Sequence, residues 1–315
     1  MLRHILARLI LMIPVIFFVS IMVFTIMHLI PGDPAYVMLG EEASQERVNA
    51  LRKELGLDRS LPVQYVSWLA KAVQGDLGRS IKSNVKVLEA ILARLPVTGY
   101  LALSAILFSI LVALPVGIIA GVKPKSTLDV LGTVFAMGGI AMPSFWLGIL
   151  LIFFFSLHLG WLPISGYVSP REDLWESLRH MVLPAVTLGG SLAATNTRFI
   201  RSSMLEVMNK EYITTARAKG LREIGVVRVH ALKNALIPVV TMLGLQLGLL
   251  FGGALVVETI FAIPGLGRLI VGAIFARDFP MVQGIVLFMA VFVLMANFLV
   301  DILYSFLDPR IRLSR

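Results

Sequence analysis

The sequence predicts an all-α polytopic membrane protein with six transmembrane helices, and three observations support that fold class. Hydrophobic residues make up 57% of the 315-residue chain and charged residues only 15%, with a mean hydropathy of +0.87. That balance is far more apolar than in a soluble domain. Apolar stretches recur at about the 20-residue length that a helix needs to cross a bilayer. Lys and Arg gather in only some of the intervening loops, as they do on the cytoplasmic side of membrane proteins.

The first span is predicted at Leu9–Ile30, and Arg3 and Arg8 before it indicate a cytoplasmic N-terminus. No small-residue cleavage site interrupts this stretch, so we expect it to be kept as a span and not removed as a signal. Residues 31–97 form a polar region that is long enough to be translocated despite its charges. We expect short helices there, the last of them capped by Asn84 and separate from the next span.

The next three spans are predicted at Gly99–Val122, Leu128–Leu159 and Met181–Thr197. Pro143 breaks the middle one of these, which membrane helices tolerate when neighbouring helices satisfy the freed carbonyl groups. The short loop at 123–125 reads Lys-Pro-Lys, so we expect it to be cytoplasmic.

A basic loop covers residues 198–238. Up to Lys233 it holds eight Lys or Arg against three Glu, whereas the external loop Gly160–His180 holds two Arg against three acidic residues. This asymmetry sets the orientation of the spans. Glu211–Lys219 is predicted to be a short helix that Gly220 ends, and a second helical run follows it. The loop is either a solvated cytoplasmic connection or a docking element for a soluble partner.

The fifth span, Ala235–Val257, carries small residues on one stripe, which lets helices approach closely. The stripe consists of Gly244, Gly248 and Gly252. Packing is its expected role, with direct substrate contact as the alternative. An external loop up to Pro280 is expected to form a structured turn or a re-entrant hairpin. The sixth span is Met281–Leu307, and we expect Asp301 near its cytoplasmic end to make a helix-end salt bridge or hydrogen bond.

Motifs for catalysis and metal binding are absent from the sequence. It lacks the P-loop pattern for ATP, the zinc-protease HExxH pattern and the Gly-x-Ser-x-Gly pattern of serine hydrolases. It has no cysteine, and its five histidines share no ligand spacing. We therefore expect no catalytic residue, no metal site, no bound cofactor and no nucleic-acid partner. The candidates for the translocation path are Thr195, Asn196 and Gln246, although packing hydrogen bonds explain them equally well.

Three classes of function remain open at this point: a transporter subunit driven by a separate ATPase, an ion-coupled secondary carrier or channel, and a membrane enzyme or assembly scaffold. A carrier would be marked by ion-coupling acids in mid-membrane, and an enzyme by a catalytic dyad. The sequence shows neither, so it favours the first class.

Residues of the basic loop resemble a known family. Thr214, Thr215 and Ala216, followed after three residues by Gly220, resemble the Glu-Ala-Ala-x-x-x-Gly motif by which ABC importer permeases hold their ATPases. Two Thr replace the first Glu and Ala, and Pro238 falls later than in the general pattern; both departures are usual in the peptide branch of the family. The strings TARAKGL, HALKNALIPV, GDLGRS and VETIFAIPGLG extend the resemblance over nearly the whole chain. They are similar to the B-type permeases of dipeptide, oligopeptide and nickel importers.

The resemblance implies a type I ABC importer permease in a bacterial or archaeal plasma membrane, with both termini cytoplasmic. Its partners would be a second, C-type permease, two ATP-binding subunits that use ATP and Mg, and an external substrate-binding protein. The substrate would be a dipeptide, oligopeptide, glutathione or nickel chelate. Residues 1–30 would hold the N-terminus and first span, 31–97 the external helical loop, and 98–315 the five-helix permease core. The ATPase-coupling residues would be Glu211, Thr214, Thr215, Ala216, Arg217, Lys219 and Gly220, with Arg217 and Lys219 as contacts for acidic groups on the ATPase.

Overall fold

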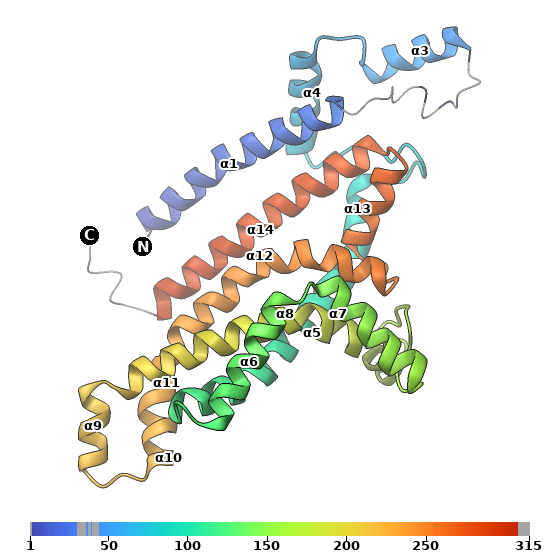
Figure 1. Ribbon diagram of the computed structural model, residues 1–315. Helices are drawn as coiled ribbons and strands as arrows, with labels where there is room; N and C mark the ends of the chain where they lie inside the picture. Colours follow the sequence, from blue (N-terminus) through green and yellow to red (C-terminus); the bar gives the residue numbers. More distant parts are fainter. Residues whose placement is uncertain (1, 30–35, 37–38, 40–43, 308–315) are drawn as a thin grey trace. The chain divides into compact units, whose positions relative to one another are not determined.

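The computed structural model describes residues 2–29, 36, 39 and 44–307, and this part of the chain is mostly helical (Figure 1). The α-helices are α1 (Leu2–Leu29), α3 (Gln45–Leu55), α4 (Leu61–Val73), α5 (Val87–Val122), α6 (Thr127–Ala141), α7 (Ser144–Leu151), α8 (Leu174–Met208), α9 (Glu211–Ala218), α10 (Glu223–Gly225), α11 (Leu232–Ala235), α12 (Ile237–Ile260), α13 (Leu266–Phe275) and α14 (Phe279–Leu307). Two segments are π-helical, η1 (Ile152–His158) and η2 (Val226–Ala231). The described residues contain no strand, and the predicted all-α class is confirmed. The side chain of Asp301, for which we predicted a helix-end contact, lies outside the described residues.

Internal contacts divide the chain into two compact units. The first consists of residues 1–97 and 265–298, and the second of residues 98–264 and 299–315. The boundary at 97/98 falls inside α5, so this helix begins in the first unit and continues in the second.

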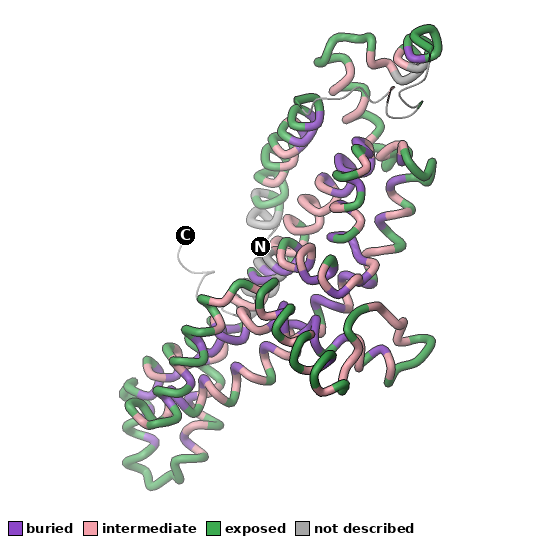
Figure 2. Tube along the Cα trace, turned by 45° about the vertical axis from the view of Figure 1, so that its right-hand side comes forward, coloured by how far each residue is buried: buried purple, intermediate pink, exposed green. Residues whose placement is uncertain are grey.

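In the first unit, α1 is exposed along much of its length (Figure 2) and packs against α4 through aromatic side chains. The ring of Phe24 lies 5.4 Å from that of Tyr65 and 6.0 Å from that of Trp68, between centroids. The hydroxyl groups of Ser20 and Tyr65 are 2.8 Å apart and share a hydrogen bond. These contacts fix α4 against the C-terminal half of α1.

Also in the first unit, the turn before α5 is fastened to the junction of α13 and α14. Gly75 and Gly78 have φ of +84° and +83°, the left-handed conformation that favours glycine. Asp278 is buried and accepts hydrogen bonds from the Ser80 hydroxyl and from the amide of Ile81 at 3.1 Å. Two segments far apart in the sequence are thereby held together.

In the second unit, α8 packs against α6, α7 and α12. The segment that we predicted as a span broken at Pro143 turns by 105° between α6 and the segment formed by α7 and η1. Pro143 is the N-cap of α7, with extended backbone (φ −60°, ψ 135°). Proline cannot donate to the preceding turn, which explains why the helix breaks here.

Two helices are longer than expected. We predicted an amphipathic helix from Asn84 and a separate span from Gly99, but α5 is one helix of 36 residues. Asn84 does not cap it, because this residue lies before the helix in a left-handed turn with φ +56°. The predicted fourth span, Met181–Thr197, is the middle of the 35-residue helix α8. A change from amphipathic to uniformly apolar sequence therefore does not mark a break in the backbone hydrogen bonds.

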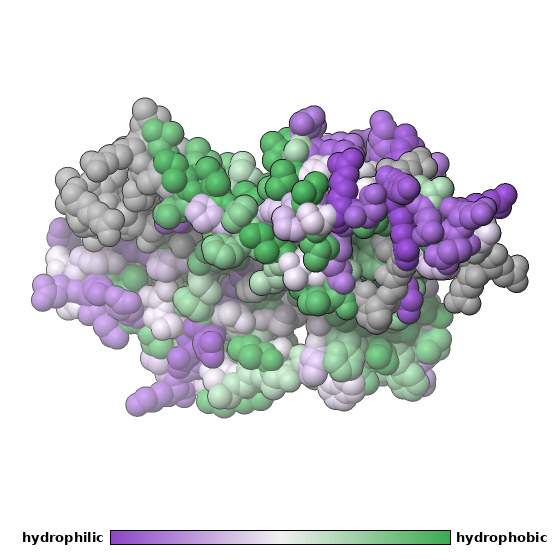
Figure 3. Space-filling view, turned by 90° about the horizontal axis from the view of Figure 1, so that it is seen from above, coloured by the Kyte–Doolittle hydropathy of each residue, from purple (hydrophilic) through white to green (hydrophobic). Residues whose placement is uncertain are grey.

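Among the described residues, three helical segments are long and apolar enough to cross a membrane: Arg8–Leu29, Val87–Val122 and Phe279–Val300. The number rises to five if each of two bent pairs counts as one span, and α8 is not among these segments. Broad hydrophobic areas reach the surface beside strongly hydrophilic ones (Figure 3). Exposed apolar area on this scale is typical of a protein whose surroundings are lipid or other subunits.

Candidate functional site

The basic loop forms a helical hairpin that projects from the ends of α8 and α12 (Figure 1). Its first arm is α9, and its second arm runs through α10, η2 and α11. Gly220 follows α9 with φ +75°, and its amide donates to the carbonyl of Arg217 at 2.9 Å. Glycine adopts this left-handed conformation without strain, so it turns the chain from one arm into the other. The helix predicted to start at Glu211 and end before Gly220 is confirmed.

The hairpin has an apolar inner face and a polar outer face. Ile213 and Ala216 on α9 are buried, as are Val226 and Ala231 on the second arm. Of the predicted coupling residues, Ala216 alone is buried, and its small side chain suits the close approach of the two arms. The exposed ones are Glu211, Thr214, Thr215, Arg217, Lys219 and Gly220. The hairpin therefore offers a polar surface on a packed support.

The apolar face of the hairpin is continuous with the core of the second unit. One cluster of buried residues joins α5, α8, the hairpin and α12. Its members are Ala113, Ile200, Met204, Val207, Met208, Ile213, Ala216, Val226, Ala231, Ala235 and Val239. Close-packed interiors transmit displacement, so a movement of the hairpin reaches these helices.

Arg217 is engaged within the hairpin. Its Nη2 lies 2.7 Å from Glu223 Oε1 and its Nε lies 3.1 Å from Glu223 Oε2, which is a bidentate pair between the two arms. These hydrogen bonds raise the pKa of the Arg217 guanidinium and lower the pKa of the Glu223 carboxyl. A second link joins the arms where Asn234 Nδ2 donates to the Tyr212 hydroxyl at 3.0 Å. The residue predicted to meet an external acid thus has an acidic partner in its own chain.

The tip of the hairpin carries exposed cations and exposed apolar side chains together. Lys219 and Arg222 are exposed on either side of Leu221, which is 47% exposed, and Ile224 is 68% exposed. Apolar groups rimmed by charges are typical of a surface that meets another protein.

Two of the three residues predicted for the translocation path come together in the second unit. Asn196 on α8 and Gln246 on α12 are both buried and exchange two hydrogen bonds, of 2.9 and 3.1 Å. Asn196 also donates to the Ser109 hydroxyl on α5 at 2.9 Å. Thr195 takes no part, because its hydroxyl donates to the carbonyl of Ser191. The sequence left open whether these residues pack or line a path, and in this structure the pair serves a three-helix contact.

An ion pair that the sequence analysis missed joins α6 to α8. Asp129 is buried in the first turn of α6 and receives both Nε and Nη2 of Arg201 on α8, the latter at 2.9 Å. It also accepts from the amide of Lys125 at 2.9 Å. Asp129 and Arg201 are 72 residues apart in the sequence. The sequence shows only that an acidic residue follows the basic loop at 123–125, and this does not predict its partner. Glu258 was missed as well; it is fully buried and accepts a 2.6 Å hydrogen bond from Thr98.

The predicted glycine stripe on α12 is only partly a packing surface. A Cβ on Gly244 would lie 2.3 Å from Val300 on α14, so a larger residue cannot fit without movement. A Cβ on Gly252 would meet nothing within 4 Å, whereas one on the neighbouring Gly253 would lie 2.9 Å from Leu188. Gly253 lies nine residues after Gly244, about half a turn round the helix, so the two glycines face different neighbours, α8 and α14.

Metal binding finds no support in the described part of the chain, where no group of three or more His, Asp or Glu side chains is placed to hold an ion.

The chain is similar to membrane components of binding-protein-dependent transport systems. Residues 113–313 match the binding-protein-dependent transport system inner membrane component, and residues 1–104 match the N-terminal membrane component of such systems. The glutathione transport system permease protein GsiC of Escherichia coli O6:H1 (strain CFT073) is 42% identical over 312 residues, 99% of either chain. The dipeptide transport system permease protein DppB of Alkalihalophilus pseudofirmus is 41% identical over 332 residues, 99% of this chain and 100% of DppB. A chain of the MetNI methionine ABC transporter, solved in inward facing conformations, has a similar fold, with a TM-score of 0.56, 18% identity and coverage of 70% of this chain and 97% of that chain.

Proposed function

We propose that this chain imports short peptides, including glutathione. The chain belongs to the family of binding-protein-dependent transport system inner membrane components and is a permease subunit of an ABC importer. The observation that carries the proposal is near-complete similarity to two permeases named for glutathione and for dipeptides. Both substrates are small molecules that contain amide bonds, so short peptides are the substrate class.

The proposed assembly contains this chain, a second permease, two ATP-binding subunits and an external binding protein. ATP and Mg act in the ATP-binding subunits, because this chain has no P-loop pattern. The chain lies in a bacterial plasma membrane with six spans and both termini in the cytoplasm. The three to five apolar segments among the described residues support a chain that crosses the membrane several times, and the concentration of Lys and Arg in the loop 198–238 supports a cytoplasmic position for that loop.

The basic loop at residues 198–238, which contains the hairpin and is called the docking loop from here on, is the proposed contact with the ATP-binding subunits. Its exposed polar face holds Thr214, Thr215 and Lys219, while Ile213 and Ala216 anchor it to the rest of the second unit. When ATP binding draws the ATPases together, the hairpin moves as a packed piece, and α5, α8 and α12 follow. The permease pair then switches from inward-facing to outward-facing, and the binding protein releases substrate into the open path.

Arg217 has a positioning role in this proposal. Its pair with Glu223 holds the two arms of the hairpin together, so direct contact with the ATPase requires that pair to open. Lys219 and Arg222 are exposed at the tip, and we assign the contacts with acidic groups on the ATPase to them.

Affinity purification of the tagged chain from gently solubilised membranes tests this function. The unaltered chain is expected to recover a second permease and ATP-binding subunits, together with ATP hydrolysis. The variant Lys219→Glu/Arg222→Glu should lose the ATP-binding subunits. The matched control Arg79→Glu/Lys82→Glu reverses two exposed charges outside the hairpin and should retain them. A chain that elutes alone, without ATP hydrolysis, would contradict the proposal.

A further inference from the structure

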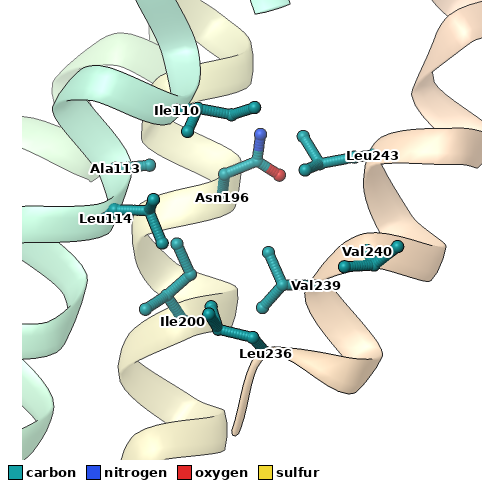
Figure 4. Close-up of a pocket in the computed structure, with 9 residues that line it drawn as sticks. All are labelled: Ile110, Ala113, Leu114, Asn196, Ile200, Leu236, Val239, Val240 and Leu243. Carbon is teal, nitrogen blue, oxygen red and sulfur yellow. The ribbon is translucent and has the colours of Figure 1, made fainter. Parts of the chain in front are cut away.

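A pocket that is partly open to the surface, called the void below, lies between the docking loop and the buried amide pair. It has a volume of about 130 Å³ and is bounded by α5, α8 and the first turns of α12 (Figure 4). Its walls are apolar except for the amide of Asn196 at one end. The lining residues from α12 and the residue before it are Leu236, Val239, Val240 and Leu243. The pocket is partly open to the surface, with Val240 47% exposed, so the first turns of α12 have free space beside them.

A bend separates this loosely packed part of α12 from the docking loop. α11 ends at Ala235 and α12 begins at Ile237, and the helical segments on either side meet at 42°. Pro238 lies in the first turn of α12, where a missing amide hydrogen costs nothing because that group has no helical partner. The bend sets the angle at which the hairpin meets α12, so a displaced hairpin acts on the first turns of that helix.

A fully satisfied polar contact lies at the other end of the void. Asn196 and Gln246 exchange two hydrogen bonds, and Ser109 on α5 adds a third. The contact therefore ties α12 to α8 and α5 at one point. Buried polar networks with all partners present hold their helices in one arrangement.

The order along the chain is hairpin, bend, loosely packed turns and fixed polar contact. We propose that Asn196 and Gln246 are positioning residues for import. Their contact is a fixed pivot, called the fulcrum below, and residues 237–245 of α12 tilt about it into the void when the docking loop moves. The inference rests on the proposed function, because the docking loop moves only if it binds the ATPases. The first turns of α12 move toward the void because space is free there. Because the helix is held at Asn196 and Gln246, a displacement of the hairpin tilts it.

A pair that only holds two helices together needs no void beside it. The space borders the turns between the pair and the docking loop, which are the turns that a lever must move. The void is also empty of polar groups other than the Asn196 amide, so no buried charge resists its closure.

Chemical cross-linking in the assembled transporter tests the fulcrum. The chain has no cysteine, so an introduced pair supplies its only thiols. Asn196→Cys/Gln246→Cys removes the three hydrogen bonds of the amide contact. It should lower binding-protein-stimulated Mg-ATP hydrolysis by at least about threefold, which is the loss expected for a single hydrogen bond between membrane helices. Linking these thiols with a short bifunctional methanethiosulfonate should restore the rate, because it restores a fixed point.

The matched pair Ala113→Cys/Val239→Cys links α5 to α12 across the void, as the first pair links α8 to α12. Linking the second pair should block the tilt and lower the rate of ATP hydrolysis by about tenfold. Reducing the link should restore that rate. This response is opposite to that of the first pair. Each comparison is made within one protein before and after linking, so a folding defect cannot produce opposite signs. The swap Asn196→Gln/Gln246→Asn should keep more activity than Asn196→Leu/Gln246→Leu, because it keeps both amides.

If linking the first pair lowers ATP hydrolysis, or if linking the second pair leaves it unchanged, the proposed fulcrum is wrong. These outcomes are read in an assembly whose unaltered form hydrolyses Mg-ATP. Absence of hydrolysis in that unaltered assembly would instead contradict the proposed function, so the two failures are distinct.

Discussion

Gly220 shows how one backbone conformation positions the docking loop. Its φ is +75°, and a Cβ there would meet nothing within 4 Å, so a side chain brings strain and no clash. Gly220→Val should destabilise the turn by about 1–2 kcal/mol and reduce ATP hydrolysis coupled to import, while membrane insertion stays normal. The measurement is binding-protein-stimulated hydrolysis together with the amount of chain in the membrane. Gly220→Asn is the matched control, since Asn tolerates this conformation better; normal coupling in the Val variant would contradict the role given to the turn.

The ion pair between Asp129 and Arg201 is expected to stabilise the chain. Asp129→Ala leaves the guanidinium of Arg201 without its partner and should lower the melting temperature of the purified chain. Asp129→Ala/Arg201→Leu removes both charges and should recover part of the loss, because no unpaired group remains. A double-mutant cycle is expected to give a coupling energy of about 0.5–3 kcal/mol. Additive effects of the two single substitutions would show that the pair contributes nothing beyond its separate residues.

The residues that the sequence could identify are those whose role is local. Gly220 ends a helix, and a glycine after a short helical run predicts that without any tertiary information. Asp129 and Arg201 meet only because α6 and α8 pack together, and nothing in the local sequence of either pairs them. The partner of Arg217 was missed for a related reason, since Glu223 lies across the turn, and only the folded hairpin brings the two side chains together.

At the scale of helices, the glycines of α12 separate close packing from open space. Gly244→Leu should lower the melting temperature of the chain, because even a Cβ would lie 2.3 Å from Val300. Overpacking of this kind typically costs about 1–3 kcal/mol. Gly252→Leu is the matched control on the same helix and should have little effect on the chain, since a Cβ there meets nothing within 4 Å.

Val300→Ala in the Gly244→Leu background provides the complementary test. It removes the methyl groups nearest to position 244 and should recover part of the lost melting temperature. Equal losses for Gly244→Leu and Gly252→Leu, with no recovery, would show that α12 packs along its whole glycine stripe as the sequence suggested.

Helix type was predictable from the sequence, and helix ends were less so. Apolar runs long enough to span a bilayer identified the regions of α1, α5, α12 and α14, because lipid requires internally satisfied backbone groups. The start of α5 at Val87 was missed because its first turns are amphipathic, and they were taken for a separate helix. The break at Pro143 was predicted correctly, since proline removes a hydrogen-bond donor, although α1 and α8 continue through Pro14 and Pro184.

For the whole molecule, the proposed topology predicts which exposed positions face the outside. The absence of cysteine allows single labels at Lys82, Ser165 and Lys123, all of which are exposed. Lys82→Cys and Ser165→Cys should react with a membrane-impermeant maleimide in intact cells, and Lys123→Cys should react only after the membrane is opened. Reaction of Lys123→Cys in intact cells would contradict the cytoplasmic placement of the loop at 123–125.

The central claim is that this permease couples ATP hydrolysis by partner subunits to the import of short peptides. Its most direct test is uptake of a labelled dipeptide and of labelled glutathione into vesicles that contain the whole assembly, with the binding protein outside and Mg-ATP inside. The expected result is accumulation of at least one of them that requires both the binding protein and ATP, and that Lys219→Glu/Arg222→Glu abolishes. Accumulation that persists without ATP and follows an ion gradient would contradict the claim and identify the chain as a secondary carrier.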